Sequence, residues 1–192
     1  NAEPTFAALQ LSGGTGDQGK LTWNADEKTL DLIQNGTTLQ LGQEVQMRIR
    51  NNSGAEISNG TVVMMTGTLG ASGKITVAPS TISTTSGLKY LLGIATEDIA
   101  NDSDGKVTTF GKVQKLDTTG SLSEGGLETW VEGNLLYVDT ANTGKLTNVA
   151  PTTGIRVPVA AVVSVHGVNG TLLVRVNNMS ELLDSNDILV TH

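Results

Sequence analysis

Apolar and polar residues alternate with a period of two over residues 1–50. Short runs place an apolar residue at every second position: Leu9 and Leu11, Leu21 and Trp23, Leu30 and Leu32, Leu39 and Leu41, then Val45, Met47 and Ile49. Successive side chains of a strand point to opposite faces, so this period predicts short β-strands whose apolar residues share one face. Asn35-Gly36, between residues 30–34 and 37–41, is typical of a two-residue hairpin turn.

A sheet built from such short hairpins is too thin to bury its own apolar face. We therefore expect residues 1–52 to form an extended, hairpin-rich N-terminal arm that packs on another surface, for example on the same segment of neighbouring subunits. The polar turn of residues 51–54 (Asn-Asn-Ser-Gly) marks the expected boundary between this arm and the rest of the chain.

Beyond this boundary, apolar runs separated by glycine-containing turns predict a series of strands. The runs are residues 61–65, 74–77, 90–96, 106–116, 135–138, 155–165 and 171–176. This spacing is typical of a β-sandwich or a small β-barrel, so residues 53–177 are expected to form an all-β domain. Residues 157–163 are nearly continuously apolar, which predicts a central strand buried on both sides, with Pro158 at a strand end or edge.

Two segments depart from the strand pattern. Residues 78–87 are rich in Ser and Thr and are expected to form a long exposed loop. Residues 178–192 are expected to form a C-terminal tail with one helical turn at residues 180–184, in which Ser180 would be the N-cap.

Composition narrows the classes of function. The net charge of −7 opposes binding to a phosphate backbone, so no nucleic-acid partner is expected. The chain has no Cys, which excludes disulfides and thiolate catalysis. No apolar run approaches the ~18 residues of a membrane span, and the N-terminus lacks the features of a signal peptide, which indicates a protein that functions without membrane transit.

Candidate catalytic and metal-binding residues are few. His166 is the only histidine away from the chain end, and we interpret it as a polar residue at a strand end. Residues 101–105 contain two aspartates but lack the ligand spacing of an EF-hand, and we interpret them as a hairpin turn. Glu124, Glu128 and Glu132 surround Trp130 in a glycine-rich stretch that we interpret as a solvated loop. No catalytic residue, metal site or cofactor is therefore predicted.

Several motifs resemble one family. Residues 19–24 (Gly-Lys-Leu-Thr-Trp-Asn), residues 29–32 (Thr-Leu-Asp-Leu) and residues 42–44 (Gly-Gln-Glu) are similar to the run that opens many virion proteins of tailed bacteriophages. Downstream motifs with the same resemblance are residues 93–100, 105–113, 132–138 and 170–176, with Glu181-Leu182. The chain thus resembles capsid decoration (cement) proteins and the virion-proximal modules of tail fibres.

This resemblance implies a non-enzymatic structural protein of the virion, made in the host cytoplasm. Fibre proteins usually continue far beyond this module and the chain stops at His192, which favours a decoration protein that binds the major capsid protein on the capsid exterior and stabilises the shell. Self-association as a homotrimer is expected, since trimers suit the local threefold axes of an icosahedral shell. The expected interface residues are Leu9, Leu11, Trp23, Leu30, Leu32, Leu39 and Leu41.

Two alternatives remain open. One is a tail-fibre or baseplate attachment protein. The other is a carbohydrate-binding or carbohydrate-cleaving module, which would depend on Trp23, Trp130, Tyr137 and nearby acidic residues.

Overall fold

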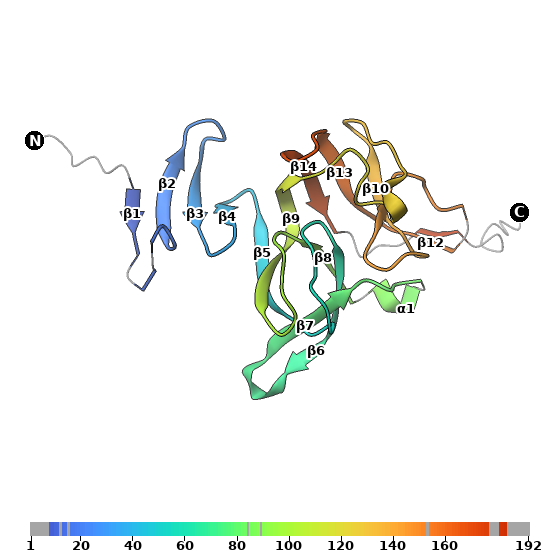
Figure 1. Ribbon diagram of the computed structural model, residues 1–192, viewed down its shortest axis with the longest axis horizontal. Coiled ribbons are helices and arrows are strands. Elements are labelled where there is room, and N and C mark those ends of the chain that lie inside the picture. The colour runs from blue at the N-terminus through green and yellow to red at the C-terminus, as the bar shows by residue number, and fades with distance from the viewer. Residues whose placement is uncertain are drawn as a thin grey trace, which may run out of the picture.

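The computed structural model describes residues 8–11, 13–14, 16–83, 85–88, 90–152, 154–176 and 181–183, and these residues form an all-β protein. Figure 1 shows a small sheet at one end of the molecule and a larger β head beside it. The predicted all-β class is confirmed.

The small sheet is an antiparallel meander of four strands, which we call the arm. Its strands lie in chain order: β1 (Ala8–Gln10), β2 (Lys20–Asn24), β3 (Thr29–Ile33) and β4 (Thr38–Gln40). The predicted hairpin between β3 and β4 is confirmed. Gly36 has a φ of 82°, and the Gln34 N–H donates to the Thr37 carbonyl oxygen at 2.9 Å to close the turn.

The head contains a closed barrel, which confirms the predicted small β-barrel. Its strands are β5 (Val45–Asn51), β6 (Val62–Leu69), β7 (Lys74–Pro79), β8 (Leu91–Ala95) and β9 (Asp104–Leu116). They lie in the order β9-β5-β7-β6-β8, and β8 pairs back onto β9 to close the ring. One core cluster belongs to these strands and the loops that join them: Ile49, Ile57, Val63, Val77, Ala95, Ile99 and Val107.

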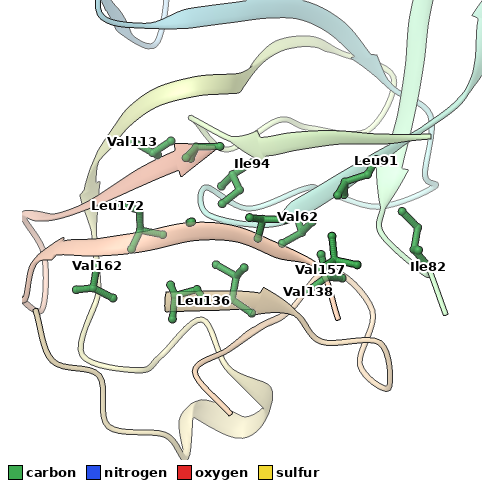
Figure 2. Close-up of a cluster of buried hydrophobic side chains, with 14 of the residues drawn as sticks. Val62, Ile82, Leu91, Ile94, Val113, Leu136, Val138, Val157, Val162 and Leu172 are labelled. Atoms are coloured by element: carbon green, nitrogen blue, oxygen red, sulfur yellow. The ribbon is translucent and has the colours of Figure 1, made fainter. Parts of the chain in front are cut away.

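The second half of β9 continues into a sheet extension outside the barrel. There β9 pairs with β14 (Gly170–Arg175), followed by β13 (Pro158–Ser164), β10 (Leu135–Val138) and β11 (Leu146–Thr147). The inner side chains of this extension, such as Leu136, Val162 and Leu172, pack with the barrel residues Val62 and Ile94 to form a cluster that we call the second core, as Figure 2 shows. The long strand β9 therefore joins two cores into one head.

The short elements complete the head. They are η1 (Gly70–Ser72), α1 (Thr85–Leu88), η2 (Glu124–Gly126), β12 (Gly154–Arg156) and β15 (Glu181–Leu183). The exposed loop predicted at residues 78–87 is confirmed only in part, because β7 extends to Pro79, α1 begins at Thr85 and the side chain of Ile82 is buried in the second core.

The predicted limit of the arm at residue 52 is wrong. The small sheet ends at Gln40, and β5 pairs with β9 and β7 inside the barrel. The polar residue Asn51 lies within the head, where its buried Nδ2 donates to the Ala55 and Ile99 carbonyl oxygens at 2.7 Å each. Its amide satisfies backbone groups of two loops, so a residue that looks like a linker in the sequence is a structural residue of the barrel.

The helical turn predicted at residues 180–184 is also wrong over the described part. Glu181–Leu183 is strand β15, which pairs antiparallel with β12 and places Leu182 opposite Ile155. Pairing with β12 supplies backbone hydrogen bonds that an isolated helical turn cannot match. The remainder of the predicted tail, residues 178–180 and 184–192, lies outside the described residues.

Strand β13 lies between β10 and β14, and Pro158 is its first residue, as predicted. Its predicted burial on both sides is wrong, because Val163 is 45% exposed while Val162 is only 2% exposed. One face of this strand belongs to the second core and the other faces outward.

Candidate interaction surface

The apolar residues of the arm gather on one face of its sheet. Leu9 lies opposite Leu21, Leu21 opposite Leu32, and Leu32 opposite Leu39, which forms a row across all four strands. Residues directly opposite one another in an antiparallel pair share a face, so the row is continuous. A second row lies two residues further along each strand: Trp23, Leu30 and Leu41. Leu11, two residues from Leu9, extends the same face.

This face, which we call the arm face, is largely uncovered by the described residues. Trp23 is 60% exposed and Leu9 is 57% exposed. Leu11, Leu30 and Leu41 are also exposed, whereas Leu21, Leu32 and Leu39 are half-buried by their neighbours. The structure thus brings all seven predicted interface residues onto one face. It adds Leu21, which the same period of two identifies.

The opposite face of the arm is polar. Thr22 and Asp31 lie opposite one another on it, and the Asn24 Nδ2 donates to Asp31 Oδ2 at 3.0 Å. Thr29 is buried there, and its hydroxyl donates to the Leu41 carbonyl oxygen at 2.6 Å. Ala8 and Ile33 are the apolar strand residues of this face, opposite Thr22 and Thr38, so the large apolar side chains of the arm lie mainly on the arm face.

The arm is attached to the head on its β4 side, as Figure 1 shows. At the hairpin tip, Lys106 of β9 donates to the Asn35 carbonyl oxygen at 2.5 Å and pairs with Glu97 of the head at 3.7 Å. At the other end, Lys112 of β9 pairs with Glu27 of the β2–β3 turn at 2.5 Å. Two lysines of β9 therefore hold the arm beside the barrel.

Glu44 occupies the joint between β4 and β5. Its Oε2 accepts the Gln40 N–H at 3.1 Å, which satisfies a donor at the end of β4. Burial raises the pKa of Glu44 above its ordinary value, the hydrogen bond from Gln40 and the charge of Lys112 oppose this, and the carboxylates of Asp31 and Glu27 add to it. Protonation or deprotonation of Glu44 therefore changes the electrostatic energy of the joint between β4 and β5.

A second group of charges surrounds Asp104 at the start of β9. Its carboxylate pairs with Arg48 at 2.6 Å, Lys74 at 2.7 Å and Arg50 at 3.4 Å. The hydrogen bond from Lys74 is the main cause that lowers the pKa of Asp104, and the two arginines act in the same direction. The acidic loop at residues 101–105 thus contributes a carboxylate that ties β5, β7 and β9 together.

The two tryptophans considered for carbohydrate binding, Trp23 and Trp130, do not form a common site. Trp130 is only 1% exposed, and its Nε1 donates to Glu128 Oε2 at 2.7 Å. The same carboxylate accepts the Asn148 N–H at 2.8 Å and the Thr147 hydroxyl. Trp130, which is buried, and Glu128, which is half-buried, are therefore parts of a hydrogen-bond network that stabilises the β10–β11 region, while Trp23 lies on the arm.

His166 acts as a local cap. Its Nδ1 accepts the N–H groups of Val168 and Asn169 at 3.0 and 2.9 Å, which organises the turn before β14. This agrees with its interpretation as a polar residue at a strand end.

Two clefts lie between the arm and the head. The larger, of about 540 Å³, is lined by the glycines of the β1–β2 loop, by Leu32 and by Arg48 and Lys106 of the head. Among the described residues, no group of three or more His, Asp or Glu side chains is arranged to hold a metal ion. Within the same residues, no helix has the length and apolar character needed to cross a membrane.

The sequence was also compared with known proteins. No model of a known protein family matches it, and no curated protein matches it.

Proposed function

We propose that this chain is a non-enzymatic structural protein of a tailed-bacteriophage virion, a capsid decoration protein that binds the major capsid protein on the outer surface of the head and stabilises the shell. The observation that carries the proposal is the arm face, an uncharged apolar surface on a sheet that is attached to a separately packed barrel. The resemblance of residues 19–24 and 93–100 to phage virion proteins supplies the identity of the particle.

The extent of the arm face supports this proposal. Its five exposed side chains are 39–60% exposed and adjoin one another, and on typical monomers contiguous apolar patches do not exceed roughly 300–600 Å². A single-layer sheet gains stability when a second layer covers its apolar face. The arm face is therefore suited to a permanent contact inside an assembly, in which the chain functions as a homotrimer.

The alternative within the same class is a tail-fibre or baseplate attachment protein, which would use the arm face in the same way. The two differ in copy number. A decoration protein is present in roughly hundreds of copies per particle, because it follows the symmetry of the shell, whereas a fibre or baseplate component is present in at most tens.

Quantitative mass spectrometry of purified particles of the encoding phage tests the proposal. We expect the chain in a fixed ratio to the major capsid protein, and we expect particles without it to lose DNA at lower temperature. A count of at most tens of copies would assign it to the tail. Absence from the particle, together with binding of the purified chain to host polysaccharide, would favour the carbohydrate-binding alternative.

A further inference from the structure

The arm and the head meet across a polar interface. Of the two clefts between them, the smaller has a volume of about 260 Å³, with Thr38 of β4 on the arm side and Gln46 of β5 and Asn59 on the head side. The side-chain oxygens Gln46 Oε1 and Asn59 Oδ1 are buried, and neither has a hydrogen-bond partner among the described residues. Burial of such atoms costs free energy, so they weaken the contact between the arm and the head.

Glu44 lies where the chain passes from the arm to the head. It is only 9% exposed, and it follows the turn of residues 41–43 between β4 and β5. On the arm side its carboxylate accepts the Gln40 N–H. On the head side it packs against Gly111 of β9, where an added Cβ would lie 2.9 Å from Glu44 Cγ. The burial of Glu44 therefore depends on the arm staying against β9.

Charged groups face Glu44 from both sides of this joint. The arm contributes Asp31 of β3 and Glu27 of the β2–β3 turn, and the head contributes Lys112 of β9, which pairs with Glu27 at 2.5 Å. When Glu44 is ionised, three carboxylates lie beside one lysine, and their mutual repulsion opposes the position of the arm against β9. The other charged residues that line the cleft are Glu97, Asp98 and Lys115.

Two hydrogen-bond acceptors of the arm beside this joint lack a donor. Asp31 lies opposite Gln40 in the sheet, so their side chains are neighbours on the polar face of the arm. Asp31 Oδ1 and Gln40 Oε1 are buried, and within the described part of the chain neither accepts a hydrogen bond. A protonated carboxyl carries an O–H donor, which the ionised form lacks. Protonation of Glu44 thus removes one charge from the joint and adds one donor to it.

We propose that the contact between the arm and the head is a pH-sensitive switch: with Glu44 protonated the arm is docked on β9, and with Glu44 ionised the arm is released and moves about residues 41–43. Gly42 can absorb this movement, since it has a φ of 84° and an added Cβ there would have no neighbouring atom within 4 Å. The switch does not depend on what the arm face binds, so it goes beyond the proposed function.

The direction of the switch follows from linkage. Burial in the docked state raises the pKa of Glu44 above its ordinary value of 4.5. A group whose pKa is raised in one state favours that state at low pH. The contribution of Glu44 to docking is therefore fully present below about pH 4.5 and is lost as the pH rises through the raised pKa. The docking equilibrium changes by at most about tenfold for each pH unit between the pKa values of the docked and released states.

Energy transfer between two fluorescent dyes measures the position of the arm. The chain has no Cys, so Ala25→Cys in the β2–β3 turn and Leu127→Cys in the head give defined labelling sites at exposed positions. In single-molecule measurements of this pair, we expect one docked population at about pH 4 and a second population that grows as the pH rises to about 8. A single population that does not change over this range overturns the inference.

Variants identify the group that titrates. Glu44→Gln keeps an oxygen acceptor for the Gln40 N–H and cannot ionise, so its arm should stay docked over the whole range. Asp31→Asn removes a neighbouring negative charge and should reduce the pH-dependent change. Glu132→Gln is the matched control, because Glu132 is exposed and lies outside the joint, and it should behave as wild type. If Glu44→Gln releases its arm with the pH dependence of wild type, the inference is wrong.

A second labelled pair separates movement of the arm from unfolding. Ala71→Cys and Leu127→Cys both lie in the head, at exposed positions. Energy transfer between them should stay constant from about pH 4 to about pH 8, which would show that the head remains folded while the arm moves. A parallel change in both pairs would mean that the head itself unfolds, and the switch would then be overturned.

Discussion

At the scale of single residues, two glycines at the β3–β4 hairpin and at the joint after β4 share a positive φ but differ in the space around them. Gly36, at the tip of the β3–β4 hairpin, has a φ of 82°, and a Cβ there would lie 1.7 Å from Glu97 Oε2 of the head. Gly42, at the joint after β4, has a φ of 84°, and a Cβ there would have no neighbouring atom within 4 Å. A substitution at Gly42 therefore tests backbone strain alone, whereas one at Gly36 adds a packing clash.

Gly36→Ala is expected to lower the free energy of unfolding by about 1–3 kcal/mol, because it combines positive φ with displacement of the Glu97 carboxylate from Lys106. Gly42→Ala should cost only the conformational part, about 1 kcal/mol. Urea denaturation of both variants measures the difference. Equal decreases in the free energy of unfolding would show that Gly36 at the hairpin tip does not pack closely against Glu97 of the head.

At the scale of elements, the joint between β4 and β5 depends on Glu44. Because burial raises its pKa, the native state retains the Glu44 proton at a pH at which the unfolded chain, with a value near 4.5, has released it. The contribution of this carboxyl therefore favours the folded state at low pH. It becomes unfavourable as the pH rises from about 4.5 through the raised pKa.

Glu44→Gln keeps an oxygen acceptor for the Gln40 N–H and removes the ionisation. We expect the variant to gain stability relative to wild type between pH 4 and pH 7, measured by urea denaturation at both values. Glu132→Gln, at an exposed position, reports the general effect of removing one negative charge from a chain of net charge −7. If the stability difference for Glu44→Gln does not change with pH, the joint is not controlled by this carboxyl.

At the scale of the whole molecule, the barrel and the sheet extension fold around two cores that contain no described residue of the arm. The arm is held by surface contacts such as the Lys112–Glu27 ion pair and the hydrogen bond from Lys106 to Asn35. Such polar contacts, which here are partly buried, contribute about 1 kcal/mol each. The head is therefore expected to be stable without the arm.

A shortened chain that begins at Gly42 should fold, with an unfolding free energy within about 2 kcal/mol of the full chain, and should be monomeric by gel filtration with light scattering. A chain that begins at Ser53 is the contrasting case. It lacks β5, so β9 and β7 lose a partner and Ile49 leaves the barrel core. Circular dichroism should show a cooperative transition only for the longer chain, and failure of that chain to fold would make the arm part of the folding unit.

Features that depend on local alternation were predictable from the sequence. A period of two specifies which residues of a strand share a face, so the arm face could be identified from Leu9, Trp23 and Leu30 without knowledge of the fold. The Asn35-Gly36 turn was also predictable. Its positive φ at Gly36 is a requirement of the turn itself and does not depend on distant contacts.

The grouping of strands into sheets, in contrast, depends on tertiary contacts. Val45, Met47 and Ile49 continue the alternation of the arm, yet β5 joins the barrel because β9 and β7 offer it hydrogen bonds on both sides. Leu182 lies in a segment whose sequence favours a helical turn, but it pairs opposite Ile155 in a strand. Strand partners lie far apart along the chain, so the free energy of their pairing is absent from any local pattern.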